Sequence, residues 1–374
     1  MSKDILIIGA GISGSVLAER YAAQGKKVLM LEKRNHIGGN CYDYIDENGI
    51  LISKYGAHLF HTNDEEVWEY VNRFSNWYKW EHKVLARVGN QLVPIPVNIN
   101  TVNRIFNLNL TTKKEMKMWL DLNRIPFKNP KNGKETVLNK IGEKLYEKMF
   151  KYYTKKQWDK YPEELNAAVL DRIPVRLNKD DRYFTDKYQA LPENGYTKIF
   201  EKMLSHKNIE IHLNTDYFDV RNTLPKFEKV FYTGPIDQFF DFKYSIKDKL
   251  EYRSIHFEFE TLNKKYFQNN SVINYPGPEV NFTRIIEYKH FGNQISDKTT
   301  IVREYSTADG EPYYPVLNEK NLRLYKLYQQ EAKKHPDIHF VGRLANYKYF
   351  NMDEAFKNAL NLFYALQTQT LKTL

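Results

Sequence analysis

Three glycines near the start of the chain have the spacing of a dinucleotide-binding turn. Gly9, Gly11 and Gly14 form the pattern G-x-G-x-x-G directly after the apolar run 4–8. In such turns the first glycine permits the bend, the second admits the pyrophosphate, and the third lets the helix pack on the strand. Amides at the start of the following helix then face the phosphates. We therefore expect residues 4–40 to bind the ADP half of a dinucleotide.

An acidic residue and a second glycine pair extend this pattern. Glu32 ends the next predicted strand, where a carboxylate can accept a hydrogen bond from a ribose hydroxyl. Gly38 and Gly39 follow, as in two-dinucleotide flavoproteins of the glutathione-reductase and amine-oxidase type. Segments 341–343 and 351–353 end a late strand and open the last helix, which would return the chain to the flavin. Together these features favour FAD over NAD.

The elements that must position these residues change character along the chain. Residues 4–32 follow a strand–helix–strand pattern, residues 101–160 are mainly helical, and residues 252–305 alternate as in an antiparallel sheet. A helix through 141–153 carries two apolar stripes, Ile141, Leu145 and Met149 in one and Tyr146, Phe150 and Tyr153 in the other. The second stripe exceeds what core burial needs and suits a stacked base.

The predicted fold class is α/β, a Rossmann-type FAD-binding domain with an inserted helical domain and an antiparallel β-sheet substrate domain. The three parts are interleaved. We expect the FAD-binding domain to comprise 1–75, about 195–240 and 335–374, the helical insertion about 98–165, and the substrate domain about 76–97, 166–194 and 241–334.

Composition narrows the class of protein and its partners. The net charge is +10, and residues 111–160 alone hold 14 basic against 6 acidic side chains, a net of +8. This charge suits either an anionic partner or a solvated lysine-rich surface. Cys41 is the only cysteine, which excludes an intrachain disulfide. With no apolar run of about 18 residues and no leader pattern, we expect a cytoplasmic protein without membrane insertion.

Several blocks of the sequence resemble bacterial UDP-galactopyranose mutases. They include Tyr-Thr-Lys-Lys-Gln-Trp at 153–158 and Tyr-Thr-Gly-Pro-Ile-Asp at 232–237. The other blocks are 55–62, 172–176, 181–184, 282–287, 312–315 and 342–344. The resemblance implies an FAD-dependent isomerase that converts UDP-galactopyranose to UDP-galactofuranose through a covalent adduct between N5 of reduced flavin and the sugar, with no net redox change. It further implies a role in cell-surface polysaccharide biosynthesis, and we expect a homodimer or higher homo-oligomer.

The resemblance also implies which residues bind each ligand. The residues expected at FAD are Gly9, Gly11, Ile12, Ser13, Gly14, Glu32, Lys33, Gly38, Gly39, Asn40, His58, Leu59, Asp216, Tyr217, Arg343, Phe350, Asn351, Met352 and Asp353. Those expected at the UDP-sugar are His82, Met149, Phe150, Tyr153, Thr154, Trp158, Arg172, Tyr183, Asn274, Arg284, Tyr314 and Tyr349. Arg172 and Arg284 would stabilise the departing diphosphate, and His58 would lie at the flavin.

Two positions depart from the family pattern. Asn351 stands where several members carry Asp, and His82 stands where others carry Asn near the sugar. Both residues can still form hydrogen bonds, so we expect tuning and not loss of activity.

Other functions stay open at this point. An FAD amine oxidase or dehydrogenase would share the N-terminal half, but it needs no nucleotide platform. A nucleic-acid-binding protein would suit the charge and the aromatic residues, yet it leaves the glycine turn unexplained, so we expect no nucleic-acid partner. UDP-N-acetylgalactosamine could be a further substrate of a mutase. His58 and His61 lack a further ligand at metal spacing, and we expect no metal.

Overall fold

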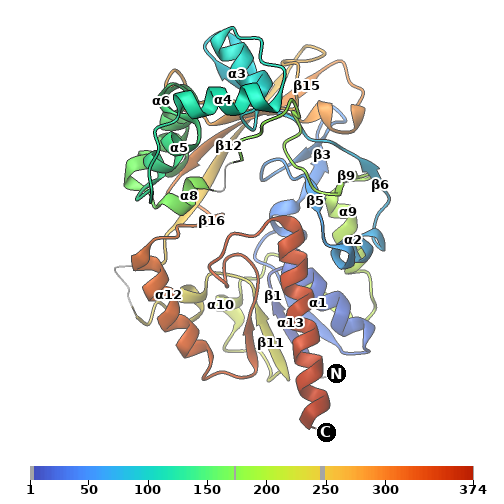
Figure 1. The fold of residues 1–374 in the computed structure, drawn as a ribbon. Helices are drawn as coiled ribbons and strands as arrows, with labels where there is room; N and C mark the ends of the chain where they lie inside the picture. Colours follow the sequence, from blue (N-terminus) through green and yellow to red (C-terminus); the bar gives the residue numbers. More distant parts are fainter. Residues whose placement is uncertain (1–3, 172–173, 245–248, 374) are drawn as a thin grey trace.

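A computed structural model describes residues 4–171, 174–244 and 249–373 of the 374-residue chain. In Figure 1 a parallel sheet with its helices occupies the lower half, and a helical group and a larger sheet occupy the upper half. This mixed α/β architecture with a Rossmann-type part confirms the predicted fold class.

The lower sheet is parallel and has five strands in the order β10-β2-β1-β11-β17. Its two central strands are short apolar runs whose residues are almost all buried, which is why the sequence lacks alternation there. The strands are β1 (Ile5–Ile8), β2 (Val28–Leu31), β10 (Ile209–His212), β11 (Lys229–Tyr232) and β17 (Ile338–Phe340). All five strands lie in segments that the sequence pattern predicts to be strands.

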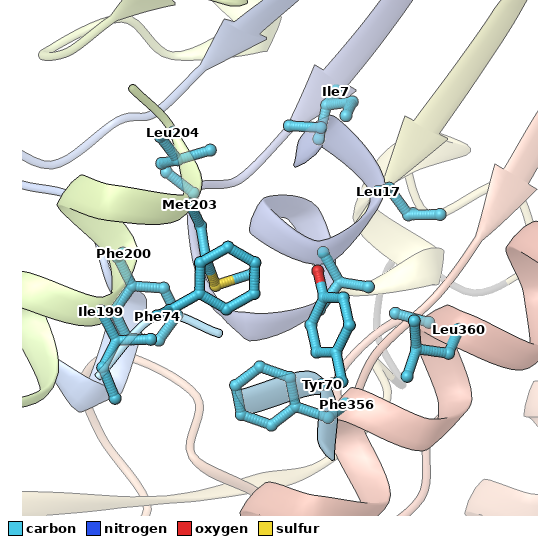
Figure 2. Packing of buried hydrophobic residues seen from close by; sticks show 14 of the residues in the cluster. Ile7, Leu17, Tyr70, Phe74, Ile199, Phe200, Met203, Leu204, Phe356 and Leu360 are labelled. Carbon is cyan, nitrogen blue, oxygen red and sulfur yellow. The ribbon is translucent and has the colours of Figure 1, made fainter. Parts of the chain in front are cut away.

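Helices cover both faces of this sheet. Figure 2 shows one face, where Ile7 of β1 packs with Leu17 of α1, Phe200 of α9 and Leu360 of α13. The opposite face is covered by shorter elements around Leu6. The helices that belong to this half are α1 (Ile12–Ala23), α2 (Glu65–Asn72), α9 (Tyr196–Met203), α10 (Tyr217–Val220), α11 (Ile236–Phe239), α12 (Glu319–Ala332) and α13 (Met352–Thr373).

The upper sheet has seven strands in the order β16-β12-β15-β14-β13-β7-β8. All its pairs are antiparallel except β13 with β7, so the predicted antiparallel sheet is confirmed with one parallel pair. Its strands are β7 (Val84–Val88), β8 (Gln91–Ile95), β12 (Tyr252–Leu262), β13 (Val272–Asn274), β14 (Arg284–Glu287), β15 (Thr299–Thr307) and β16 (Tyr314–Pro315). Two small sheets join the halves: β3 (Asp43–Ile45) with β4 (Leu51–Ser53), and β9 (Tyr188–Pro192) between β5 (Phe60–Thr62) and β6 (Trp77–Lys79).

The helical group between β8 and β9 differs from the prediction at one point. The expected helix through 141–153 is confirmed from Glu143 onwards, where the chain is helical without a gap, but its start is wrong: α5 ends at Ile141, and Gly142, whose φ is +79°, separates it from the next helix. A Cβ atom there would lie 2.0 Å from the carbonyl oxygen of Asn123. The group consists of α3 (Ile99–Phe106), α4 (Lys113–Asn123), α5 (Gly133–Ile141), α6 (Glu143–Leu145), a π-helical segment (Tyr146–Phe150), α7 (Lys151–Trp158) and α8 (Ala167–Asp171).

The described residues also include 3-10 turns at Gly39–Cys41 and Pro162–Glu164, and within Tyr288–Asn293, where a kink at Phe291 and Gly292 interrupts the helix. The described part of the chain contains no helix that is both long and apolar enough to cross a bilayer. The proposed division into three interleaved domains stays a prediction.

Candidate active site

Glycine shapes the turn between β1 and α1. Gly9 has a φ of +101°, and a Cβ atom on it would lie 2.0 Å from Thr233 Oγ1. A Cβ atom on Gly14 would lie 1.9 Å from the carbonyl oxygen of Gly9. Helix α1 then begins after Gly11 without a hydrogen bond from a capping side chain. Its first backbone amides therefore remain available to an anion.

The second glycine pair faces this turn. Gly38 N donates to the carbonyl oxygen of Ala10 at 2.8 Å. A Cβ atom on Gly39 would lie 2.8 Å from the Cα atom of Gly11. The two backbones thus form a cradle that side chains would fill. The residues present fit the diphosphate of a flavin dinucleotide, whose charge would meet the open amides of α1.

Glu32 follows β2 and lies beside the cradle. Its carboxylate accepts hydrogen bonds from the backbone nitrogens of Ala10 at 2.8 Å and Arg34 at 2.9 Å. The Glu32 carbonyl oxygen accepts from Thr215 N at 3.0 Å, which brings residues 216–217 to the same place. The turn, the acid and this segment are therefore neighbours, as a bound adenosine half would require.

A side-chain network borders this region. Lys33 Nζ lies 2.7 Å from Glu311 Oε1, so its charge is already paired. Arg34 donates to Asn40 Oδ1 at 2.9 Å, and its guanidinium lies 4.4 Å from the ring centroid of Tyr55. Two of the predicted cofactor residues, Lys33 and Asn40, thus lie next to the cradle within this network.

The chain returns to the glycine turn just before α13. A Cβ atom on Gly342, whose φ is +94°, would lie 2.8 Å from Ser13 Oγ. Asn351 N donates to Glu354 Oε2 at 2.7 Å, which satisfies one amide ahead of the helix. The segment 350–353 therefore lies at the N-terminal end of α13, with the polarity that suits an electron-rich ring.

His58 lies between β4 and β5 beside a small cavity that Asp43 and Tyr196 help to line. Its Nδ1 donates to the carbonyl oxygen of Gly56 at 2.9 Å, which leaves Nε2 as an acceptor when the ring is neutral. Burial lowers the pKa of His58 to about 4, despite the opposing effect of that hydrogen bond. His58 is therefore neutral near pH 7, and the next residue, Leu59, packs against the core of Figure 2.

Metal binding has no support in the described residues, since no group of three or more His, Cys, Asp or Glu side chains there could hold an ion. His61, which the sequence placed near His58, instead has its Nδ1 3.1 Å from Asp186 Oδ2. Its ring stacks on Phe184 with centroids 3.7 Å apart.

Arg284 opens β14 and is the centre of a second cluster. Its Nη2 donates to the Tyr153 hydroxyl at 2.9 Å, and its Nε lies 3.3 Å from Glu304 Oε2. One third of the Arg284 side chain is exposed, so a ligand can reach it. Burial lowers the pKa of the guanidinium. A larger, opposite effect comes from Tyr153, Glu304, Tyr183 and Tyr314, so the pKa lies above its ordinary value. The Arg284 guanidinium is thus permanently positive.

Arg284 Nε forms an ion pair but no hydrogen bond, and two buried polar atoms near it also lack a hydrogen-bond partner among the described residues: Oδ1 of Asn274 and Nδ1 of His82. Asn274 pairs with Arg284 across β13 and β14 and is 7% exposed, while His82 is 4% exposed. Burial and the Arg284 charge lower the pKa of His82 to about 3, so the ring is neutral. Such orphan groups are destabilising by about 1–3 kcal/mol each, which a ligand hydroxyl could offset.

The predicted base platform lies on the π-helical segment and α7. Phe150, Tyr153 and Trp158 are half-buried, whereas Met149 and Thr154 are buried. Tyr146, which the sequence pattern grouped with Phe150 and Tyr153, is fully buried in the core of the helical group. The exposed ring stripe is therefore shorter than predicted, because the π-helical turn rotates Tyr146 inward.

Aromatic rings connect the end of the chain that returns to the glycine turn with the residues around Arg284. Tyr314 and Tyr349 stack with centroids 5.7 Å apart. The Arg343 guanidinium lies 5.3 Å and 5.2 Å from their centroids. Burial raises the pKa of the Tyr314 hydroxyl to about 12, which keeps it a donor at neutral pH. The predicted cofactor residue Arg343 and the predicted sugar residues therefore meet at one place.

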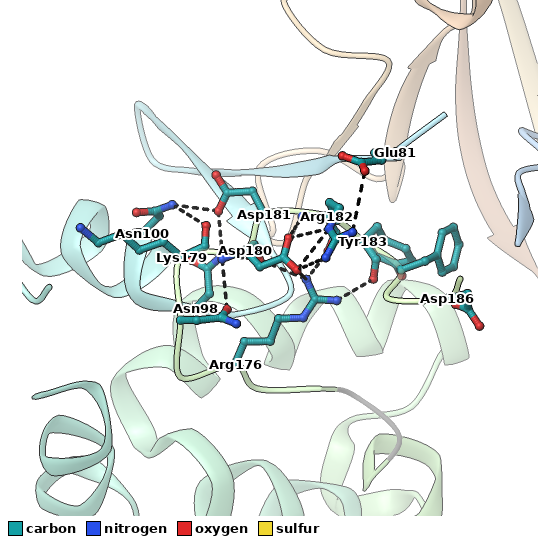
Figure 3. Close-up of polar contacts among 12 residues, drawn as sticks. Glu81, Asn98, Asn100, Arg176, Lys179, Asp180, Asp181, Arg182, Tyr183 and Asp186 are labelled. Atoms are coloured by element: carbon teal, nitrogen blue, oxygen red, sulfur yellow. Dashed lines mark hydrogen bonds and ion pairs between the residues drawn. The ribbon is translucent and has the colours of Figure 1, made fainter. Parts of the chain in front are cut away.

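Arg172 lies outside the described residues. The chain that follows it is held by the polar contacts of Figure 3. Asn98 donates to Asp181 Oδ1 at 2.7 Å, and Arg176 Nη2 donates to the carbonyl oxygen of Tyr183 at 3.2 Å. These contacts place the Tyr183 ring 5.9 Å from that of His82, measured between centroids.

Two residues in the cluster were not predicted from the sequence. Glu304 is 6% exposed on β15 and pairs with Arg284. The sequence feature that could have identified it is an acidic residue at an inward-facing position of a predicted strand. Lys156 lies inside the block 153–158, but a lysine on a lysine-rich helix gives no local sign of burial. Its Nζ donates to backbone carbonyls of the β13–β14 loop.

Relatives that match more than nine tenths of this chain in sequence include several mutases. A family model described as UDP-galactopyranose mutase matches residues 148–349, and one described as an NAD(P)-binding Rossmann-like domain matches residues 7–74. A probable UDP-galactopyranose mutase from Klebsiella pneumoniae is 38% identical over 96% of this chain and 93% of its own length. A dTDP-fucopyranose mutase from Escherichia coli is 36% identical over 95% of this chain and 96% of its own.

A solved structure of reduced UDP-galactopyranose mutase supports the same fold. It superimposes with a TM-score of 0.77 at 18% identity, over 98% of this chain and 96% of that one. The dinucleotide-binding match together with the family indicates a flavin cofactor. The oxidase alternative is not favoured, because the relatives that are 36–38% identical in sequence over 95–96% of this chain are mutases.

Proposed function

The chain belongs to the UDP-galactopyranose mutase family, and from this premise we propose that it converts UDP-galactopyranose into UDP-galactofuranose on FAD. When bound and reduced, FAD would supply a nucleophile, its N5 atom, for covalent attachment of the anomeric carbon, with no net redox change. The chain must then hold the departing UDP close enough to rejoin the sugar, and it must keep water away.

The observation that carries this proposal is the surroundings of Arg284. A guanidinium that is one third exposed and bonded to Tyr153 lies near Tyr314, which stacks on Tyr349. A fixed positive charge suits a pyrophosphate that gains negative charge as its bond to the sugar breaks. Arg172, as a second diphosphate ligand, is part of the proposal by resemblance only.

The remaining groups have roles that follow from their chemistry. Phe150, Tyr153 and Trp158 offer partly exposed rings on which a uracil can stack. The orphan atoms of Asn274 and His82 would pair with hydroxyls of the sugar. A neutral His58 can accept a hydrogen bond at Nε2 without placing a charge beside the cofactor. The cradle of Gly11 and Gly39 would hold the FAD diphosphate.

A direct assay tests the proposal. The purified protein should carry a flavin spectrum, and after reduction with dithionite it should interconvert UDP-galactofuranose and UDP-galactopyranose, as resolved by chromatography. The oxidised protein should be inactive. Absence of interconversion by a fully reduced flavoprotein would overturn the proposal, and so would steady turnover that consumes an electron acceptor.

A second substrate is favoured by one specific observation. The dTDP-fucopyranose mutase relative is 36% identical, against 38% for the probable UDP-galactopyranose mutase, so overall similarity hardly separates them. The two substrates differ in the base methyl, the ribose 2′-hydroxyl and the sugar 6-hydroxyl. Ratios of kcat/KM for UDP-galactopyranose, UDP-N-acetylgalactosamine and dTDP-fucopyranose would assign the substrate. A ratio in favour of the dTDP sugar would replace the first proposal.

A further inference from the structure

Lys156, one turn beyond Tyr153 on α7, is enclosed by backbone oxygens. Its ammonium donates to four carbonyl groups of a single loop, 275–282. The four acceptors are the carbonyl oxygens of Tyr275, of Gly277 at 2.8 Å, of Val280 at 3.2 Å and of Phe282 at 3.1 Å. A lysine ammonium has only three N–H bonds, so the cage more than satisfies it.

The caged loop connects the two strands that carry the diphosphate and sugar residues. Asn274 ends β13, Arg284 opens β14, and the two are paired across the ladder. Helix α7 carries Tyr153 and Trp158. Lys156 therefore links the helix of the proposed base platform to the loop between Asn274 and Arg284. The Tyr153–Arg284 hydrogen bond, 2.9 Å long, connects α7 to β14, the strand that follows this loop.

The carbonyl cage keeps the Lys156 ammonium charged although the ammonium loses contact with water. Burial lowers the pKa of Lys156 to about 8, although Glu279 acts in the opposite direction. The ammonium form still predominates at pH 7, because the carbonyl dipoles replace water around it. An apolar side chain has no donors for these carbonyls, so the ammonium holds the loop at a set distance from α7 by hydrogen bonds.

A second caged lysine provides the comparison. Lys289 is 1% exposed, and its Nζ donates to the carbonyl oxygens of Lys265 at 2.7 Å, Ser296 and Lys298 at 3.1 Å. None of these residues belongs to the proposed site. The fold thus uses the same device twice, once inside the seven-stranded sheet region and once between the platform helix and the site loop.

We propose that Lys156 is a positioning residue that sets the distance between the base platform on α7 and the diphosphate site at Arg284. This proposal rests on the proposed function, because the two parts that Lys156 aligns are the sites for the base and for the diphosphate of the substrate. Lys156 touches neither substrate nor cofactor in this scheme. Its contribution is uniform binding of the nucleotide, which is made equally in the ground state and the transition state.

The local structure should survive removal of the Lys156 side chain. The next residue, Gln157, has its carbonyl oxygen fixed by Ser306 Oγ at 2.6 Å and Arg253 Nε at 3.3 Å, so α7 stays attached to β12 and β15. Lys155 offers a matched control, because it sits one position earlier on α7 and pairs only locally with Asp159 at 3.0 Å.

The experiment compares Lys156→Met, Lys155→Met and Lys289→Met as full-length flavoproteins, with UDP as the probe. For Lys156→Met we expect about a tenfold weaker UDP affinity by calorimetry and about a tenfold higher KM, with kcat within about threefold of the starting protein. Flavin content should be unchanged. Lys155→Met should match the starting protein, and Lys289→Met should lower the unfolding temperature without changing UDP affinity.

Two outcomes would overturn the assignment. Unchanged UDP affinity and KM in Lys156→Met is one, and an equal fall of kcat and kcat/KM with unchanged KM is the other. If Lys156→Met does not fold, Lys156→Gln keeps an N–H donor without the charge and undergoes the same measurements. The starting protein separates this test from the proposed function: if it binds UDP but does not isomerise the sugar, only the function fails.

Discussion

The glycine turn and the Arg284 cluster lie at the two ends of the proposed site and are built in opposite ways. The turn takes its form mainly from close backbone approaches among residues 9–39, although Gly9 also packs against Thr233. Arg284 is held instead by side chains from distant segments, such as Tyr153, which is 131 positions away. Damage to the turn should therefore affect folding and cofactor binding, whereas damage to the cluster should affect chemistry in an intact flavoprotein.

The largest expected effect is on the turn. A Cβ atom in Gly14→Ala would lie 1.9 Å from the Gly9 carbonyl oxygen, so helix α1 cannot seat on β1. We expect loss of soluble, flavin-containing protein. In Gly11→Ala the nearest atom would be the Gly39 Cα at 3.7 Å, an ordinary contact. That variant should fold but bind FAD about a hundredfold more weakly, since the methyl group displaces the pyrophosphate.

Flavin content, circular dichroism and FAD titration of the apoprotein would separate these two variants. If Gly14→Ala folded with bound FAD, the close packing of helix on strand would not be required. If Gly11→Ala bound FAD normally, the cradle would not be the diphosphate site.

The cluster is tested next by Arg284→Ala. We expect kcat/KM to fall by at least about 10³-fold, because one preorganised donor contributes 10²–10³ and the charge is lost as well. Flavin content and the unfolding temperature should stay close to those of the starting protein. Arg303→Ala is a suitable control, since Arg303 lies on the adjacent strand and pairs with Glu258 at 3.1 Å on the surface. Near-normal turnover of Arg284→Ala would remove the diphosphate assignment.

The same contrast explains what could be predicted from the sequence. The turn, Glu32 and the strands around them follow from local rules, because each constraint involves residues close together in the chain. No local rule selects Arg284 or Asn274 from the other arginines and asparagines, and these two were identified only through resemblance to a family. Helical periodicity singled out Tyr153 within an aromatic stripe. The proximity of all three residues in space came from the structure.

The errors and omissions have physical causes of the same kind. Gly142 was a local signal, since glycine commonly ends a helix, but the apolar stripes on both sides of it suggested continuity. The inward rotation of Tyr146 depends on a π-helical turn that side-chain periodicity does not reveal. Lys156 and Glu304 are charged residue types that usually lie at the surface. The partial burial of Lys156 is shown only by its long-range partners, and strand alternation gives only a weak sign that Glu304 is buried.

A smaller effect is expected from Glu304→Gln. The Arg284 charge would remain, but its partner 3.3 Å from Nε would lose its own charge. We expect kcat to fall about tenfold with UDP affinity changed less than about threefold, in line with a partly buried ion pair that orients a donor. Burial raises the pKa of Glu304, although Arg284 opposes this. Protonation as pH falls would therefore mimic the variant.

The pH profile of kcat supplies the check on this prediction. The starting protein should lose activity on the acid side as Glu304 takes up a proton, and Glu304→Gln should lack that part of the profile. An unchanged acid limb in the variant would assign the limb to another group. An unchanged kcat would show that Arg284 needs no orienting partner.

The smallest expected effect is on stability, through His82. Burial and Arg284 lower the pKa of His82 to about 3, and His61 adds to the shift, so the folded state keeps the ring neutral. The unfolded chain binds a proton below the ordinary pKa of about 6.5, and stability therefore falls as pH decreases from that value towards 3. Asn does not titrate, so His82→Asn should lose about 1–2 kcal/mol less stability than the starting protein between about pH 7 and pH 5. Unfolding temperatures at the two pH values should then differ by a few degrees less in the variant. Equal losses of stability in both proteins would mean that the His82 ring gains a proton in the folded state. The orphan Nδ1 would then be a hydrogen-bond donor. It could not be the acceptor that a neutral ring can offer to a sugar hydroxyl.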